Sequence, residues 1–141
     1  MKKKICIAVA NYYPNISMNL IKGASKILKI NSIKNYKIIK VPGIFELPFL
    51  IAKKINQYDG FIALGCVIKG QTQHFELISK STINALMKLT ITYKKPIGNG
   101  IITCLNQKQA LERSNPNKKD KGGEAAKALL SVLGVIDDKS K

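Results

Sequence analysis

The chain has 141 residues, 45% of them hydrophobic, which is the size and composition of one globular domain with a single core and leaves no room for two. Its 24 Lys and Arg residues outnumber its 8 Asp and Glu residues, and the formal net charge of +16 favours anionic ligands. No apolar run approaches the ~20 residues of a membrane-spanning helix, and the apolar stretch 5–10 lacks a signal-peptide cleavage site, so we expect a cytoplasmic protein.

Elements that read as strands and as helices alternate along the chain. Short apolar runs bounded by turn residues predict strands at 5–9, 36–41, 61–67 and 96–103. Apolar residues at helical spacing predict helices over 16–28, ending at Asn31 and Ser32, and over 47–55, 75–89, 107–113 and 125–136. The segment 114–120 is predicted to be a polar loop.

This alternation predicts a parallel sheet with right-handed crossovers and helices on both faces. The predicted fold class is therefore α/β, a three-layer, flavodoxin-like sandwich around a four-stranded, mainly parallel sheet. Residues 1–141 form a single domain in this prediction. A sheet this small keeps exposed edges, which favours a homo-oligomer.

The three cysteines, Cys6, Cys66 and Cys104, each lie in a separate apolar run. They lack the C-x-x-C spacing of a zinc site, and nothing in the pattern indicates a disulfide framework, so we predict small core residues and no metal. The lysines are mostly scattered, without interleaved aromatic residues, which favours a basic surface. A nucleotide-binding or nucleic-acid-binding module remains the alternative.

In a parallel α/β sheet the carboxyl ends of the strands meet at one edge, where ligands bind. We expect this edge to gather Tyr12, the turn 43–46, the turn 70–74 and the region 98–100. Gly70, Gln71 and Thr72 are predicted to open a helix, whose free amide groups and positive dipole end can hold a phosphate. A plain helix cap is the competing interpretation of these residues.

Each of the other candidates at this edge also has a purely structural interpretation. His74 is the only histidine, and beside a bound anion it can carry protons near neutral pH, although a lone histidine is often structural. Glu46 can accept hydrogen bonds from ligand hydroxyls or cap a helix. Tyr12 and Phe45 can stack on a planar heterocycle or fill the core. The only arginine, Arg113, can clamp an anion in bidentate fashion or remain a surface charge.

Five segments, in this order, resemble the lumazine synthase family. They are VPGIFELP at 41–48, GCVIKGQTQHF at 65–75, KPI with Gly100 at 95–100, QALER at 109–113 and KGGEAA at 121–126. The resemblance implies a transferase of riboflavin biosynthesis, which catalyses its penultimate step. That step condenses 5-amino-6-(D-ribitylamino)uracil with 3,4-dihydroxy-2-butanone 4-phosphate to give 6,7-dimethyl-8-ribityllumazine, phosphate and water.

The resemblance also implies residue roles, pentamers with an active site shared between adjacent subunits, and no cofactor. His74 matches the general acid or base, and Arg113 matches the phosphate clamp. The other matches are Tyr12, Ile44, Phe45 and Glu46 for the ring and ribityl chain, Cys66, Val67 and Ile68 for the strand end beneath the ring, Gln71 and Thr72 for the phosphate turn, and Asn99 for a contact supplied by the neighbouring subunit.

Some positions depart from the family pattern. Ile44 stands where a small residue is common, Gln71 replaces the usual Glu or Ala, and Asn99 occupies a place that is often Phe. The loop 115–120 differs from the family's usual sequence, and Lys121 is only a supporting candidate. The rival enzyme is the related archaeal-type riboflavin synthase, which shares the fold but needs no phosphate clamp, and the set of Thr72, His74 and Arg113 disfavours it.

Overall fold

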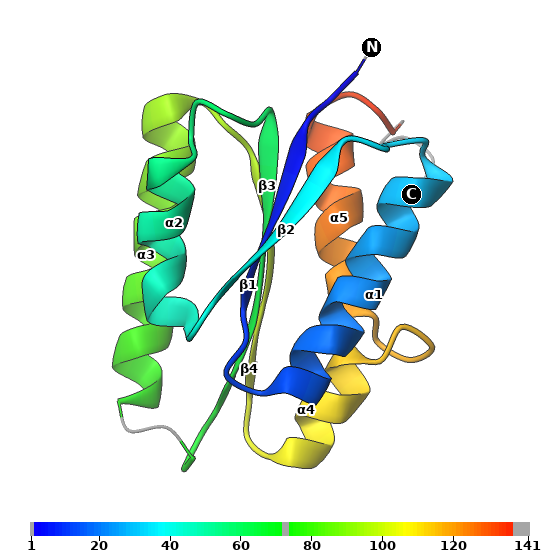
Figure 1. Cartoon of the computed structure of the whole chain (residues 1–141). Helices are drawn as coiled ribbons and strands as arrows, with labels where there is room; N and C mark the ends of the chain where they lie inside the picture. Colours follow the sequence, from blue (N-terminus) through cyan, green and yellow to red (C-terminus); the bar gives the residue numbers. More distant parts are fainter. Residues whose placement is uncertain (1, 72–73, 137–141) are drawn as a thin grey trace.

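The computed structural model describes residues 2–71 and 74–136, and its helices lie in two layers on either side of one sheet (Figure 1). Helices α2 (Leu47–Lys53) and α3 (Phe75–Tyr93) cover one face. Helices α1 (Pro14–Ile30), α4 (Gln107–Ser114) and α5 (Lys121–Val132) cover the other. The three-layer α/β prediction is confirmed.

The sheet has four strands in the order β2-β1-β3-β4, and every neighbouring pair is parallel. The strands are β1 (Ile5–Ala10), β2 (Tyr36–Val41), β3 (Gly60–Ile68) and β4 (Ile97–Cys104). In register, Ile7 lies between Ile38 and Ile62, and Gly65 lies beside Ile101. All the carboxyl ends therefore meet at one end of the molecule, the lower end in Figure 1.

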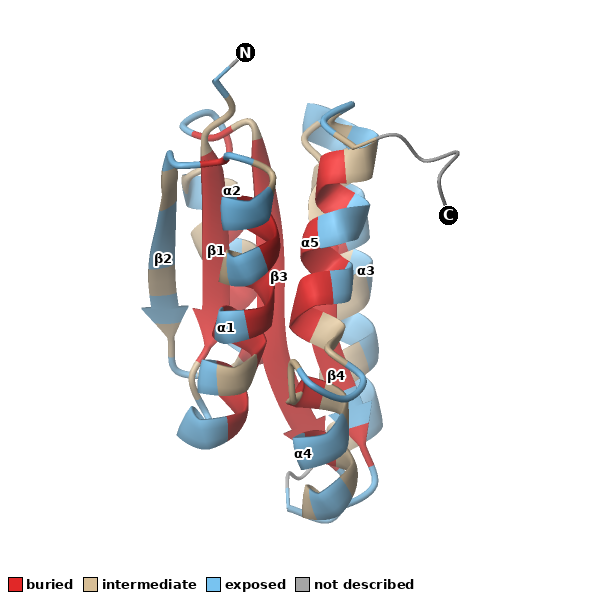
Figure 2. Cartoon of the chain, turned by 90° about the vertical axis from the view of Figure 1, so that its right-hand side faces the viewer, coloured by how far each residue is buried: buried red, intermediate tan, exposed pale blue. Residues whose placement is uncertain are grey.

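Burial explains why the strands read as apolar runs. Strands β1 and β3 are buried along their whole length, since helices cover both of their faces, whereas the edge strand β2 contains only half-buried and exposed residues (Figure 2). Alternate strand residues enter two separate apolar clusters, one on each side of the sheet. The cysteines are free and buried, as predicted.

Helix boundaries differ locally from the predicted ranges, and the last helix spans Lys121–Val132 instead of 125–136, so Ile136 lies beyond its end. Helix α1 ends at Ile30, and Ser32 takes a positive φ of 61°, which stops the helix where the sequence predicted. Helix α2 ends at Lys53, so Ile55 is buried in a turn rather than in the helix. None of the helices in the described part of the chain combines the length and the apolar character that crossing a membrane requires.

Candidate ligand site

A small cavity opens where β1 and β3 end. Its volume is about 140 Å³, and its lining includes four of the residues predicted from sequence, Tyr12, Phe45, Cys66 and Val67. Ile44, the first residue of the short 3₁₀ helix η1 (Ile44–Glu46), contributes a fifth. The sheet therefore brings these five predicted residues together, although they come from three separate segments of the chain.

The two predicted stacking rings are not core residues. Tyr12 is 60% exposed and Phe45 is 73% exposed, although both line the cavity. Large aromatic side chains contribute most to stability when they are buried. Two rings as exposed as these, beside an apolar cavity, are suited to stack on a ligand. In this chain, core packing does not account for either ring.

The Glu46 carboxylate uses one of its oxygens to stabilise the turn in which it lies. The Gly43 amide donates to its Oε1 atom over 2.8 Å, which forms the capping interaction considered above and fixes the turn that carries Ile44 and Phe45. One carboxylate oxygen is thereby engaged in holding the turn. The capping role of Glu46 is observed, and a ligand role would use its remaining acceptor capacity.

The turn after β3 differs from the prediction. Gly70 takes a positive φ of 85°, and the Gln71 amide donates to the Ile68 carbonyl over 3.2 Å, which closes a tight turn instead of starting a helix. His74 is the residue before α3 and also has a left-handed backbone, so α3 begins only at Phe75. The prediction that Gly70, Gln71 and Thr72 open the helix was wrong. Thr72 itself lies outside the described residues.

His74 and Gln71 are both exposed at the carboxyl edge of the sheet, and the His74 carbonyl accepts the first helical bond, from the Ile78 amide, at 2.8 Å. The imidazole is thus outside the core. Ile68 ends β3 with 1% exposure and packs into the cluster beneath α1 and α5. Its side chain therefore belongs to the face opposite α2 and α3, and Ile68 does not line the cavity.

The region 98–100 does not reach the carboxyl edge, contrary to prediction. Asn99 lies beside Ala63 in the middle of the sheet, because β4 starts at Ile97 and continues to Cys104. Its side-chain oxygen accepts the Ile101 amide over 3.1 Å. Asn99 lines separate hollows on β4, one of them shared with Arg113, Thr103 and Lys121. Within one chain, Asn99 and Arg113 are therefore not part of the Tyr12 cavity.

Arg113 folds back over the end of β4. Its Nη1 atom donates to the Thr103 carbonyl over 2.8 Å and reaches Cys104 Sγ at 4.0 Å. The neighbouring Cys66 thiol and, to a smaller extent, the Arg113 guanidinium lower the pKa of the Cys104 thiol from 9.0 to about 7, although burial opposes both. The Cys104 side chain and burial raise the pKa of Cys66. Arg113 is thus held in place rather than left as a free surface charge.

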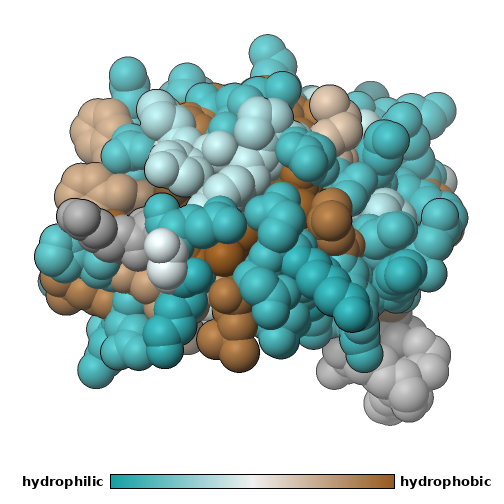
Figure 3. Space-filling view, turned by 90° about the horizontal axis from the view of Figure 1, so that it is seen from below, coloured by the Kyte–Doolittle hydropathy of each residue, from teal (hydrophilic) through white to brown (hydrophobic). Residues whose placement is uncertain are grey.

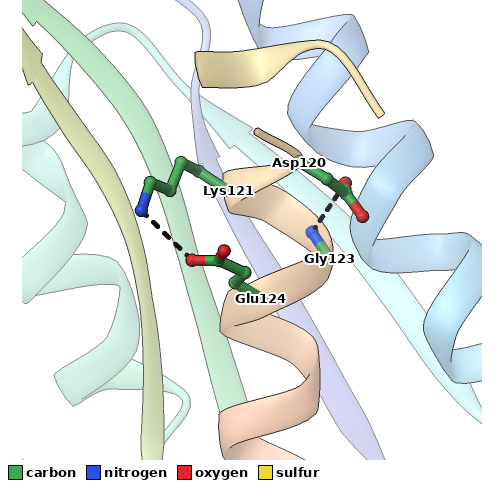
Figure 4. A network of polar contacts seen from close by, with 4 residues as sticks. All are labelled: Asp120, Lys121, Gly123 and Glu124. Atoms are coloured by element: carbon green, nitrogen blue, oxygen red, sulfur yellow. Dashed lines mark hydrogen bonds and ion pairs between the residues drawn. The ribbon is translucent and has the colours of Figure 1, made fainter. Parts of the chain in front are cut away.

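The start of α5 borders the Arg113 hollow. Asp120 has a left-handed backbone, and its Oδ1 atom accepts the Gly123 amide over 3.2 Å, which caps the helix (Figure 4). Lys121 forms an ion pair with Glu124, with 3.1 Å between Nζ and Oε1, and it also lines the hollow beside Arg113. An exposed pair of this kind contributes little to stability and leaves the lysine available to a stronger anion.

Two contributors were not predicted from sequence. Ile78 lines the cavity, and the Thr103 carbonyl holds Arg113. Ile78 lay on the predicted apolar stripe of its helix, which was the only available signal for it. The role of Thr103 depends on backbone geometry, for which the sequence carries no signal.

Viewed from the carboxyl edge, apolar atoms lie between hydrophilic side chains (Figure 3). An apolar hollow with a few polar groups around it is the usual form of a small-molecule site. Within residues 2–71 and 74–136, no three His, Cys, Asp or Glu side chains gather closely enough to bind a metal ion together. Fold and site together define a parallel α/β protein with an apolar cavity at the carboxyl edge of its sheet.

Comparison with known proteins identifies the family. Residues 2–137 match the family described as 6,7-dimethyl-8-ribityllumazine synthase. The protein of that name from Bartonella tribocorum is 44% identical over a 141-residue alignment, which covers 96% of this chain and 92% of the relative. The one from Blochmanniella pennsylvanica is 43% identical, covering 96% and 89%, and the one from Novosphingobium aromaticivorans is 41% identical, covering 94% and 95%. The chain belongs to the 6,7-dimethyl-8-ribityllumazine synthase family.

Proposed function

We propose that this chain condenses 5-amino-6-(D-ribitylamino)uracil with 3,4-dihydroxy-2-butanone 4-phosphate to form 6,7-dimethyl-8-ribityllumazine, phosphate and water. It would thus act as a transferase in the penultimate step of riboflavin biosynthesis. The observation that carries the proposal is the family match over residues 2–137, which includes every proposed site residue. Neither a metal nor an organic cofactor is part of the proposal.

The cavity of Tyr12 and Phe45 is suited to the pyrimidine. The two open rings can cover a flat heterocycle, while Ile44, Cys66 and Val67 supply an apolar wall. Glu46 has acceptor capacity left for the ribityl hydroxyls after its bond to the Gly43 amide. We assign Ile68 a supporting role at the end of β3, since its side chain is buried on the other face.

Phosphate binding is assigned to Gln71, Thr72 and Arg113. Gln71 lies just before the amino end of α3, whose free amide groups and dipole favour an anion. The Arg113 guanidinium can add two parallel hydrogen bonds to phosphate oxygens. Together these groups would hold the butanone phosphate and stabilise phosphate as it leaves.

His74 is assigned the proton transfers. Schiff-base formation, phosphate elimination and ring closure each move a proton, and imidazole is the side chain that both gives and takes protons near neutral pH. Its exposed position between the turn at Gln71 and the start of α3 supports this role. Much of the acceleration would still come from holding two substrates together.

We infer that the complete site forms between adjacent subunits of a pentamer. The cavity of about 140 Å³ in one chain is smaller than the ~300 Å³ or more of typical ligand sites. Asn99 and Arg113 line a hollow of their own on β4, so a neighbouring copy that brings this hollow to the Tyr12 cavity would complete the set. The three free cysteines are in keeping with a cytoplasmic location.

The test is to supply the purified protein with both substrates. We expect lumazine fluorescence together with one phosphate released for each lumazine formed, and a particle mass that is a multiple of five chains. Lumazine supplied alone tests the archaeal-type riboflavin synthase reaction, for which we expect no product. Absence of lumazine from both substrates would overturn the proposed function, and a monomeric but active protein would overturn the shared site.

A further inference from the structure

Arg113 has two acceptors in this structure, both in the last residues of β4. The Thr103 carbonyl is 2.8 Å from Nη1, and Cys104 Sγ is 4.0 Å from the same nitrogen. Thr103 points its side chain to the exposed side of the strand, whereas Cys104 is 1% exposed. Because Cys104 is packed in the core, its sulfur has a fixed position, and its contact with Arg113 can hold the guanidinium in one orientation.

A second cysteine lies near Cys104 in the core. Cys66 lies beside Ile102 in the parallel register, two residues from Cys104 across the β3–β4 pair, and both thiols enter the same core cluster. The neighbouring Cys66 thiol and the Arg113 guanidinium together lower the pKa of the Cys104 thiol, against the effect of burial.

This arrangement connects the two hollows of the chain. Cys66 also lines the cavity of Tyr12 and Phe45, and Arg113 lines the hollow with Lys121. From this geometry we propose that Cys104 is a positioning residue, which orients the Arg113 guanidinium for a phosphate. The inference rests on the proposed function only in taking Arg113 as the phosphate clamp.

The experiment measures the affinity of the assembled protein for inorganic phosphate, which does not depend on turnover. In Cys104→Ala, Arg113 keeps the Thr103 carbonyl but loses the sulfur, so we expect affinity to fall about three- to tenfold. Cys104→Ser restores a polar acceptor and should lie within about twofold of the unmodified protein. Cys6→Ala, which truncates a buried cysteine on the opposite face of the sheet, is the matched control and should leave phosphate affinity unchanged.

A double-mutant cycle separates positioning from simple structural damage. If Cys104 acts through Arg113, then Cys104→Ala should change phosphate affinity by less than about twofold in an Arg113→Gln background. With both substrates, the single variant should raise the KM for the butanone phosphate and leave kcat and the KM for the pyrimidine near their original values.

Three results would overturn the inference: unchanged phosphate affinity in Cys104→Ala, an equal loss in the Arg113→Gln background, or unchanged affinity in Arg113→Gln itself. Should Cys104→Ala not fold, Cys104→Ser decides alone, because a loss as large as that of Arg113→Gln would contradict the rescue. A protein that binds phosphate through Arg113 and Cys104 but makes no lumazine would refute the proposed function and leave this inference standing.

Discussion

His74 combines an exposed imidazole with a left-handed backbone, at φ 62° and ψ 32°. Histidine is among the few non-glycine residues that adopt this conformation at modest cost, together with Asn and Asp. The left-handed conformation of His74 directly precedes α3, so the helix begins at the next residue, Phe75. A single residue thus sets the start of the helix and presents the proposed proton carrier.

Replacing His74 should slow catalysis without ending it. We expect His74→Ala to lower kcat by about 10²-fold, because a proton carrier is lost while the positioning of both substrates remains. His74→Asn tolerates the left-handed backbone and should show the same loss, which separates the chemistry from strain. The measurement is the steady-state rate of lumazine formation, and complete inactivity in a folded, assembled variant would contradict this division of labour.

Glu46 allows the cap to be separated from the proposed ligand role. Glu46→Gln keeps an oxygen for the Gly43 amide, so the free energy of unfolding should stay within about 0.5 kcal/mol while the KM for the pyrimidine rises. Glu46→Ala also loses the cap and should be about 1 kcal/mol less stable. Denaturant unfolding and KM values test both statements, and equal KM values for Glu46→Gln and the unmodified protein would refute the ligand role.

At the scale of elements, α5 packs against α1 through glycine. A Cβ atom on Gly122 would lie 2.2 Å from the Leu20 carbonyl oxygen, and backbone atoms cannot give way as a flexible side chain can. Gly122 therefore allows the two helices to approach at the level where Asp120 caps α5. This approach places Lys121 beside the Arg113 hollow.

Gly122→Ala tests that approach. Alanine normally favours a helix over glycine, so a gain in stability would be expected from propensity alone. We expect instead a loss of about 1–3 kcal/mol, since the helices must separate. Thermal or denaturant unfolding measures it, with the exposed Lys127→Ala on the same helix as control. Equal or greater stability in Gly122→Ala would show that the contact is not tight.

Strand β1 is buried on both faces, which affects the one thiol that it carries. Burial raises the pKa of Cys6 from its ordinary value of 9.0 to about 11, against a smaller opposing effect of the Lys54 charge. The unfolded chain ionises this thiol near pH 9, before the folded chain does. The resulting stabilisation is complete below pH 9 and is lost as the pH rises from 9 to 11.

Cys6→Ala removes this titration. We expect the free energy of unfolding of the unmodified protein to fall more steeply between pH 9 and 11 than that of Cys6→Ala, and the two to run parallel between pH 6 and 8. Other groups titrate in both proteins and cancel in the difference. Parallel curves across the alkaline range would mean that Cys6 ionises as readily in the fold as in the unfolded chain.

On the scale of the whole molecule, the dominant feature is an unbalanced positive surface. The chain carries a formal charge of +16, yet Lys121 and Glu124 form the single ion pair found among the described side chains. Like charges that face one another through water destabilise the compact state, and salt screens them within about 10 Å at 0.1 M. An anionic substrate would be attracted by the same field.

Added salt should therefore stabilise this protein. We expect the Tm at constant protein concentration to rise by a few degrees between 20 and 200 mM NaCl, as screening relieves the repulsion. Sucrose at matched osmolality is the control for general exclusion effects. An unchanged or lower Tm in salt would show that the lysines are far enough apart to be already screened.

Much of the site was predictable because motif and topology agreed. Tyr12, Phe45 and Val67 were expected at the carboxyl edge, and they line one cavity there. The prediction failed for the turn at Gly70, where two left-handed residues delay the helix to Phe75, and for Asn99, which the register of β4 places in mid-sheet. Left-handed turns and strand register depend on distant contacts that local spacing does not report.

The amino-acid order alone determined the alternation of strands and helices, the buried faces and the family, because periodicity and motif residues are local properties of the chain. Only the tertiary structure decided that Arg113 is held by Thr103 and Cys104, and that its hollow is separate from the Tyr12 cavity. These facts follow from how far β4 runs beside β3 and how closely α5 approaches α1. Both are set by packing between segments far apart in sequence.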